Sequence, residues 1–143
     1  MNVNQFKKRK NNLLSLTYKI NVIKDTSFII SSYNNDSINV NDKVYNLPLC
    51  ILGREFFAWK DNNVLNLTSS LMIELTNKFF EINKVNVEVI IIGLVRKKIN
   101  HLLSLKKKCE EKKIPIDIMK FDSACRTLNI LNSENRKVIS ILI

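Results

Sequence analysis

The run VIIIGLV, residues Val89 to Val95, decides the fold that this sequence predicts. It is too short for a membrane span, which needs roughly 18 apolar residues, and it has the length of a buried strand. Its lack of polar alternation is typical of a strand whose sheet is covered by helices on both faces. We therefore expect residues 86–95 to form an inner strand of an α/β domain.

A helix is predicted on each side of this strand. Residues 67–83 begin with Thr68 as a candidate N-cap and continue with apolar residues at helical spacing. These residues are Met72, Leu75, Phe79 and Ile82. Residues 96–113 predict a second helix, whose lysine-rich side faces water. Its inward seam consists of Ile99, Leu102, Leu105 and Cys109.

The alternation continues to the end of the sequence. Residues 114–121 predict a strand, residues 122–132 a helix, and residues 136–143 a last strand. Strand, helix, strand, helix, strand at this spacing indicates right-handed crossovers on a largely parallel sheet.

The first half has a different texture. Residues 16–60 contain short runs of β-branched and aromatic residues, separated by turns rich in Asn and Asp. Trp59 is expected to be a core or half-buried aromatic residue. We expect a three-layer α/β/α sandwich: a central mixed, largely parallel sheet with an antiparallel β-rich N-terminal portion. Residues 13–143 would form this single α/β domain, preceded by a flexible basic N-terminus at residues 1–12.

Composition limits the classes of function. Among 143 residues the net charge is +10, which nucleic acid or an anionic membrane would attract. An AT-biased genome, which enriches Lys, Asn and Ile, explains the same charge without a ligand. Nucleic-acid modules add stacking aromatics or Gly-rich loops, whereas aromatic residues make up 8% here and glycine occurs twice. Nucleic-acid binding is therefore the disfavoured reading.

The cysteines and the N-terminal region bear on the compartment. Cys50, Cys109 and Cys125 contain no CxxC pair, so we expect no metal site and no disulfide framework. A secretory signal is not recognisable. We expect a bacterial-type cytoplasm. The alternative is the mitochondrial matrix of a eukaryotic source, because no acidic residue precedes Asp25, as in an organelle transit peptide.

The C-terminal third resembles a known family. The segment IDIMKFDSACRTLNILNSENRKVISILI, residues 116–143, is similar to the end of a small domain family of bacteria and archaea that includes a mitochondrial assembly factor for respiratory complex I. The matching positions are Met119, Ala124, Cys125, Arg126, Thr127, Asn129, Glu134 and Arg136. Residues 39–51 resemble the segment upstream. The resemblance implies a small three-layer α/β domain.

Three departures from the family pattern bear on function. The Gly-Thr-Gly loop of the family is replaced by Gly93-Leu94-Val95-Arg96, which weakens the case for an anion-binding loop. Asn135 stands where the family carries a glycine, in a left-handed position that Asn tolerates. Leu128 replaces a tyrosine and keeps the packing face of the helix.

The candidate ligand or partner site is a set of eight residues. They are Gly93, Arg96, Asp122, Ser123, Cys125, Arg126, Asn129 and Arg136. Gly93, Arg96, Arg126 and Asn129 are expected around the crevice at the carboxyl ends of the parallel strands, where open α/β sheets bind ligands. The alternative reading is that Arg126 pairs with a carboxylate or a terminal carbonyl and serves only the fold.

The start of the 122–132 helix is the remaining candidate for chemistry. Asp122 or Ser123 would be its N-cap. Cys125 near a helix N-terminus could have a lowered thiol pKa, but nothing in the sequence brings a base such as His101 to it, so a structural cysteine is favoured. We expect no catalytic residue.

The sequence predicts one leading function and two alternatives. The leading reading is a non-catalytic protein-interaction domain without a cofactor. The resemblance implies help in assembling a respiratory membrane complex, with its subunits as partners, and the basic surface suits peripheral contact with a membrane. The alternatives are a small-ligand or anion-binding module at the strand-end crevice, and nucleic-acid binding through the lysine-rich surface.

Overall fold

The computed structural model describes residues 17–24, 27–59 and 66–143, so the predicted flexible N-terminus at residues 1–12 lies outside the described residues. The elements in chain order are β1 (Thr17–Val22), β2 (Ile30–Tyr33), β3 (Ser37–Val40), β4 (Lys43–Asn46), β5 (Leu49–Leu52), β6 (Glu55–Trp59), α2 (Ser69–Asn83), β7 (Val89–Leu94), η2 (Ile99–Leu102), α3 (Leu103–Glu111), β8 (Ile116–Lys120), α4 (Phe121–Ser133) and β9 (Val138–Leu142).

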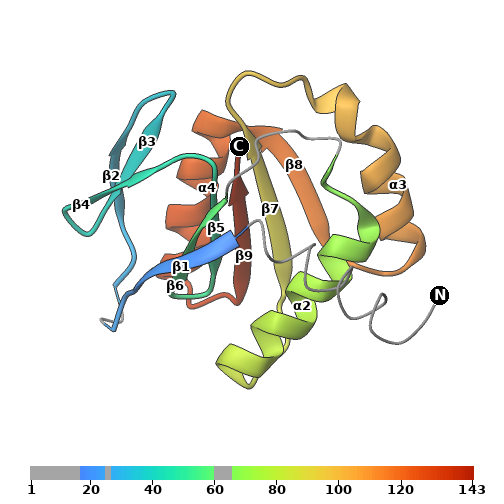
Figure 1. Cartoon of the computed structure of the whole chain (residues 1–143), viewed down its shortest axis with the longest axis horizontal. Helices are drawn as coiled ribbons and strands as arrows, with labels where there is room; N and C mark the ends of the chain where they lie inside the picture. The colour runs from blue at the N-terminus through green and yellow to red at the C-terminus, as the bar shows by residue number, and fades with distance from the viewer. Residues whose placement is uncertain (1–16, 25–26, 60–65) are drawn as a thin grey trace.

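A six-stranded mixed sheet in the order β1-β6-β5-β9-β7-β8 forms the centre of the molecule (Figure 1). The apolar run from Val89 to Val95 contains β7, which pairs in parallel with both β8 and β9. The strands β9, β5, β6 and β1 then continue the sheet in antiparallel fashion. The predicted α/β fold with a mixed sheet is confirmed, and the parallel pairing is concentrated around β7.

The β-rich N-terminal portion is divided between two sheets. Strands β2, β3 and β4 form a separate antiparallel sheet, while β1, β5 and β6 join the large one. The change occurs between β4 and β5, which Leu47 and Pro48 separate. Proline lacks the N–H that a continuing strand would need.

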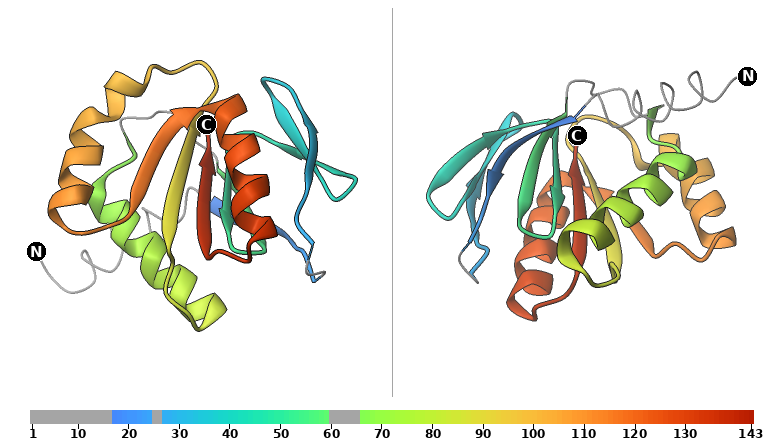
Figure 2. Two further views of the ribbon diagram at one scale, coloured as in Figure 1. Left: turned by 180° about the vertical axis from the view of Figure 1, so that it is seen from behind. Right: turned by 60° about the horizontal axis from the view of Figure 1, so that its bottom comes forward.

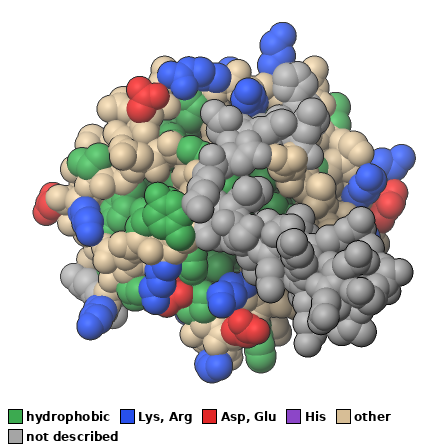
Figure 3. Space-filling view, viewed as in Figure 1, with side chains coloured by type: hydrophobic (Ala, Val, Ile, Leu, Met, Phe, Trp, Pro, Cys, Tyr) green, Lys and Arg blue, Asp and Glu red, His purple; other side chains and the backbone are tan. Residues whose placement is uncertain are grey.

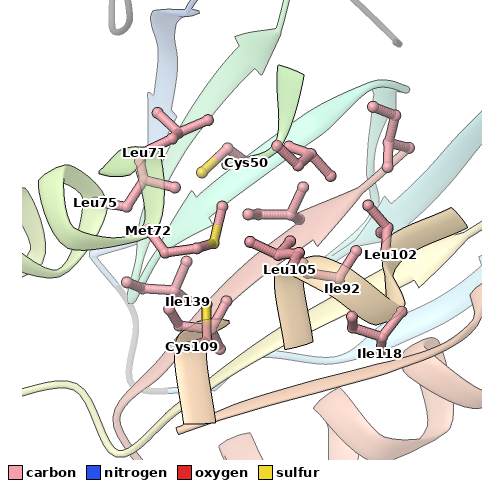
Figure 4. Packing of buried hydrophobic residues seen from close by; sticks show 14 of the residues in the cluster. Cys50, Leu71, Met72, Leu75, Ile92, Leu102, Leu105, Cys109, Ile118 and Ile139 are labelled. Carbon is pink, nitrogen blue, oxygen red and sulfur yellow. The ribbon is translucent and has the colours of Figure 1, made fainter. Parts of the chain in front are cut away.

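The helices cover both faces of the large sheet. In the right-hand view of Figure 2, α2 and α3 lie on one side, and α4 with the small sheet lies on the other. Figure 4 shows Met72 of α2 and Leu105 of α3 pointing onto the strands beside Ile139 and Ile92. The opposite core includes Leu128 of α4 and Ile38 of the small sheet, both fully buried. Trp59 is buried at the end of β6, as predicted.

Helix α2 follows its sequence signals closely. The Oγ1 atom of Thr68 accepts a hydrogen bond from the N–H of Leu71 at 3.2 Å, which confirms the predicted N-cap. Met72, Leu75 and Phe79 are buried, and Ile82 is half-buried against the same core.

The segment after β7 corrects one prediction. Residues 96–113 do not form one continuous helix: an irregular stretch and the 3-10 turn η2 precede α3. Leu102, Leu105 and Cys109 are buried as expected, but Ile99 is 37% exposed. A 3-10 turn winds more tightly than an α-helix. A residue in η2 therefore does not point in the direction that the α-helical spacing of α3 would give it. Ile99 therefore does not belong to the inward seam.

Candidate functional site

Gly93 lies where α4 crosses the large sheet. It belongs to a row of residues that runs across the sheet from Leu49 through Leu142 to Met119. A Cβ atom at Gly93 would stand 2.6 Å from the Cβ of Ala124 and 3.0 Å from the Cδ2 of Leu142. The absence of a side chain thus lets α4 approach β7, and this packing accounts for the glycine.

Arg96 follows β7 at the carboxyl end of the parallel strands. Its Nη2 atom lies 3.4 Å from the Oδ1 of Asp36, and both side chains are largely exposed. A hollow of about 210 Å³ opens beside this pair, between the turn that links β2 to β3 and the residues after β7. Its lining includes Pro48, Val95 and Lys97. A hollow is therefore present at the strand ends, lined by both apolar and charged residues. Of the four residues expected around it, Arg96 lines it, whereas Gly93, Arg126 and Asn129 do not.

The start of α4 differs from the sequence prediction. Neither Asp122 nor Ser123 is the N-cap: β8 runs directly into the helix, Lys120 occupies the cap position without a side-chain hydrogen bond, and Phe121 is already helical. Asp122 instead stands in the first turn, where its charge suits the helix dipole, and its carboxylate accepts from the N–H of Ser123 at 2.9 Å.

Arg126 lies one turn along α4 and completes an exposed cluster with these two residues. Its Nη1 atom is 3.7 Å from the Oδ2 of Asp122, and its Nη2 atom donates to the Oγ of Ser123 at 3.3 Å. Both contacts are local to the helix, and the Arg126 side chain stays 63% exposed. The guanidinium is held by its neighbours but remains open to a partner.

Cys125 points to the interior. Its residue is 1% exposed. The pKa of its thiol is raised to about 12, chiefly by burial and also by the charge of Asp122, while Arg126 opposes the shift. The raised pKa is the opposite of what a nucleophilic cysteine at a helix N-terminus requires. The side chain belongs to the core that α4 forms with the large sheet.

Asn129 joins α4 to the small sheet. Its Oδ1 atom accepts from the N–H of Ile30 at 2.7 Å, and its Nδ2 atom donates to the carbonyl of Ile30 at 2.9 Å. At the far end of β2, the ring of Tyr33 meets the buried ring of Phe121 edge-on at 5.4 Å. Strand β2 thus runs along α4 between these two contacts.

We call this region the α4–β2 seam, defined by Ile30, Tyr33, Asp122, Arg126 and Asn129. Sequence reasoning did not identify Tyr33, which is 43% exposed. The one available signal was its position before the turn-forming Asn34-Asn35-Asp36, but nothing in the sequence pairs it with Phe121.

Arg136 lies at the opposite end of the strands, just before β9. Its Nε atom donates to the Oε2 of Glu88 at 2.7 Å, and the same oxygen accepts from the N–H of Lys137 at 3.0 Å. The Lys137 amide and the Arg136 guanidinium hold the pKa of Glu88 below its ordinary value, and Glu88 raises the pKa of Arg136. This ion pair links the beginnings of β7 and β9.

The eight predicted residues therefore divide into separate groups. Asp122, Ser123 and Arg126 lie together on α4, and Asn129 lies further along the same helix against β2. Cys125 is on the buried face of α4, and Gly93 is buried beneath that helix. Arg96 borders the crevice and Arg136 stands at the other end of the strands. In the described ranges, no group of three or more His, Cys, Asp or Glu side chains could hold a metal ion. None of the described helices is long and apolar enough to span a bilayer.

Comparisons with known proteins place the chain. A protein family described as "protein of unknown function (DUF498/DUF598)" matches residues 30–143. The assembly factor 3 of the NADH dehydrogenase (ubiquinone) 1 alpha subcomplex of Drosophila melanogaster is 25% identical over 126 residues, which cover 86% of this chain and 62% of that protein. The chain thus spans less than two thirds of the length of this relative. The resemblance predicted from the C-terminal third is confirmed.

Solved structures share the fold. A crystal structure of a Bordetella parapertussis protein has a TM-score of 0.62 and 21% identity, and covers 85% of this chain and 98% of its own. A solution structure from Xanthomonas campestris has a TM-score of 0.62 and 20% identity, with coverages of 83% and 86%. A Bordetella pertussis protein described as a Mth938-like domain has a TM-score of 0.60 and 19% identity, with coverages of 87% and 92%.

Proposed function

This chain belongs to the DUF498/DUF598 family of proteins of unknown function, and from that premise we propose that it is a non-catalytic protein-interaction domain that assists assembly of a respiratory membrane complex. The observation that carries this proposal is the similarity to the Drosophila assembly factor over 126 residues. The partners would be subunits of that complex. The compartment would be the cytoplasm of a bacterial-type cell, or the mitochondrial matrix of a eukaryotic one.

The chemistry of the described residues supports a role without catalysis. The three thiols are all buried, and burial raises the pKa of both Cys50 and Cys125 to about 12. A nucleophilic cysteine needs the thiolate at neutral pH, which these environments disfavour.

The α4–β2 seam is the surface we propose for the partner. Arg and Tyr are the residue types that most often dominate binding energy at protein interfaces. Here the exposed guanidinium of Arg126 is fixed by Asp122 and Ser123, and the ring of Tyr33 is fixed by Phe121. Fixed side chains lose less conformational entropy on binding, so a partner would meet a preorganised surface.

Co-purification from native membranes tests this proposal. The tagged full-length chain would be isolated from detergent-solubilised membranes of its source cells, and we expect subunits of the NADH dehydrogenase complex to be enriched. Tyr33→Ala with Arg126→Ala should reduce that enrichment about tenfold or more, in line with two interface residues of hot-spot type. The matched control, Val44→Ala with Lys43→Ala, changes an exposed apolar residue and a cation on β4 and should retain it.

Two results would overturn the proposal. In the first, no protein partner is recovered. In the second, cells that lack the chain assemble the respiratory complex at the normal rate and amount. Equal losses in the seam variant and its control would leave the assembly role intact and reject only the seam as its surface.

We also propose a second candidate function, the binding of a small anion in the strand-end crevice. It is favoured by the hollow of about 210 Å³, whose rim carries Arg96 and Lys97. Calorimetry with inorganic phosphate at low salt should show binding that Arg96→Ala abolishes, while Lys43→Ala leaves it unchanged. If the unmodified chain gives no heat with phosphate, this candidate fails.

A further inference from the structure

Two large aliphatic side chains are exposed at the junction of η2 and α3. Ile99 is 37% exposed and Leu103 is 57% exposed, and they stand four residues apart at the beginnings of these two elements. The neighbouring Leu102, Leu105 and Cys109 are buried and hold the segment on the large sheet. Ile99 and Leu103 therefore project from a fixed part of the fold.

Lysines surround these aliphatic side chains. No Asp or Glu occurs from Val89 to Cys109, and Lys98, Lys106, Lys107 and Lys108 fall within this stretch. In the part of the chain that the structure describes, the recorded ion pairs involve none of these four lysines. Lys98, Lys107 and Lys108 are exposed and Lys106 is half-buried.

We call this surface the η2–α3 patch, defined by Lys98, Ile99, Leu103, Lys106, Lys107 and Lys108. In Figure 3, several Lys and Arg side chains lie along the top of the molecule, where Figure 1 draws the connection from β7 toward α3, and others are spread over the rest of this face. The closest acidic residues along the chain are Glu110 and Glu111, which stand at the far end of α3. The patch thus extends from η2 to the last turn of α3, where Lys108 precedes these two glutamates.

We propose that the η2–α3 patch docks the protein on the surface of an anionic membrane. Exposed aliphatic residues between lysines are typical of helices that lie in a bilayer interface: the apolar side chains enter the boundary between headgroups and acyl chains, and the lysines meet anionic headgroups. The patch contains no aromatic side chain. Nucleic-acid surfaces usually add aromatic stacking to their positive charge, so lipid fits this patch better.

The geometry makes membrane contact compatible with the proposed function but independent of it. The patch lies on the face of the sheet covered by α2 and α3, whereas the α4–β2 seam lies on the face covered by α4 (Figure 2). A chain docked through the patch would keep its seam free. Failure of membrane binding would therefore not be failure of partner binding.

Vesicle co-sedimentation with the full-length chain tests the proposal. We expect binding to vesicles of phosphatidylcholine with 30% phosphatidylserine, and about tenfold or more weaker binding to phosphatidylcholine alone, because several lysines contribute. Lys98→Glu with Lys107→Glu should reduce binding to the anionic vesicles about tenfold or more. The control Lys24→Glu with Lys43→Glu makes the same change in net charge elsewhere and should change binding less than about twofold.

The aliphatic residues are tested separately. Leu103→Ser should weaken vesicle binding several-fold and remove the part that survives at high salt, whereas Ile130→Ser, at a residue of α4 that is 58% exposed, should not. Circular dichroism checks that each variant is folded.

Three results would overturn the proposal: no binding to anionic vesicles, equal losses in the patch and control variants, or no effect of Leu103→Ser. The nucleic-acid reading would replace it if random-sequence RNA bound more tightly than the vesicles. In that case binding should also depend on Lys98 and Lys107 and ignore Leu103→Ser.

Discussion

At Gly93, the space for a side chain is already taken by the helix that lies over the sheet. The nearest atoms to a new Cβ belong to Ala124 and Leu142, which are both fully buried. A glycine in the middle of an inner strand otherwise weakens it, so its presence in β7 reflects the close approach of α4. The family pattern has a glycine-rich loop at this point, and here the first glycine serves packing.

Gly93→Ala should lower the free energy of unfolding by about 1–3 kcal/mol, because the added methyl group overpacks the core. Urea denaturation measures this loss. The control is a double-mutant cycle with Ala124→Gly, which removes the Cβ of Ala124, the atom closest to the new methyl group. The double variant should then lose less than the sum of the two single variants. Strictly additive losses would show that the contact with Ala124 does not limit this position.

Cys125 offers a second test at the level of one residue. Because burial raises the pKa of its thiol to about 12, the reactive thiolate is scarce at neutral pH. We expect iodoacetamide to label Cys125 only as fast as the protein unfolds, at a rate like that of Cys109, which is also buried. Peptide mass spectrometry follows each site separately. Rapid labelling of Cys125 alone in the folded protein would reopen the reading of this residue as a nucleophile.

Glu88 and Arg136 make stability depend on pH. The pKa of Glu88 is lowered in the folded protein, so the folded state favours the carboxylate. A lowered carboxyl pKa contributes stability that is present above the pKa of the unfolded state and is lost as pH falls through that of the folded state.

Glu88→Gln should therefore reduce the drop in stability between pH 7 and pH 3, and it should cost little at pH 3 itself. Denaturation midpoints at both pH values measure the effect. Glu81→Gln removes an exposed carboxylate whose contact with Lys78 is longer, at 3.7 Å, and serves as the matched control. A Glu88→Gln protein with the same acid sensitivity as the unmodified chain would show that the ion pair adds nothing.

At the level of elements, local signals in the sequence predicted what local physics determines. Thr68 caps α2 because its hydroxyl is placed three residues before a free N–H, and Asn135 takes a left-handed conformation after α4. The N-cap of α4 was predicted wrongly because β8 joins that helix without a loop, which no short motif reveals. Ile99 was placed in the core because its spacing fits an α-helix, but the chain there forms a 3-10 turn.

Contacts between distant segments were the harder part of the site. Asn129 and Ile30 are 99 residues apart, and Asp36 and Arg96 are 60 residues apart. The family resemblance identified Asn129 and Arg126 as notable, but only the structure shows that the first joins two elements and the second stays exposed. Arg136 was grouped with them by motif, although it stands at the opposite end of the strands.

The attachment of β2 to α4 gives a prediction for these elements. Asn129→Ala removes both hydrogen bonds to Ile30 and leaves two part-buried backbone groups without that partner, which should cost about 1–3 kcal/mol. Hydrogen exchange should accelerate at the Ile30 amide and along β2, while β9 stays protected. Ser133→Ala, at an exposed residue of the same helix, should leave β2 unchanged. Unaltered exchange in β2 of Asn129→Ala would mean that Tyr33 and Phe121 hold the strand alone.

Over the whole molecule, α4 is the layer that the two sheets share. Its buried face forms one core with residues of the large sheet, such as Ile91, and of the small sheet, such as Val40. The first turn of α4 contributes to the proposed partner surface, the α4–β2 seam. The η2–α3 patch lies on the other side of the large sheet. Each proposed surface is thus held in place by the buried side chains with which α3 or α4 packs on the large sheet.

Leu128 is the residue that tests this arrangement. It is fully buried in the core between α4 and the two sheets, so Leu128→Ala should create a cavity and lower the free energy of unfolding by about 2–5 kcal/mol. Because both sheets pack on this core, they should lose stability together. Fluorescence of Trp59 reports on the large sheet and hydrogen exchange of the β3 amides reports on the small one. Ile130→Ala, which removes an exposed side chain two residues along, should change stability by less than about 0.5 kcal/mol. If β3 opens in Leu128→Ala while Trp59 keeps its original transition, the small sheet is an independent unit, and α4 does not couple it to the rest of the fold.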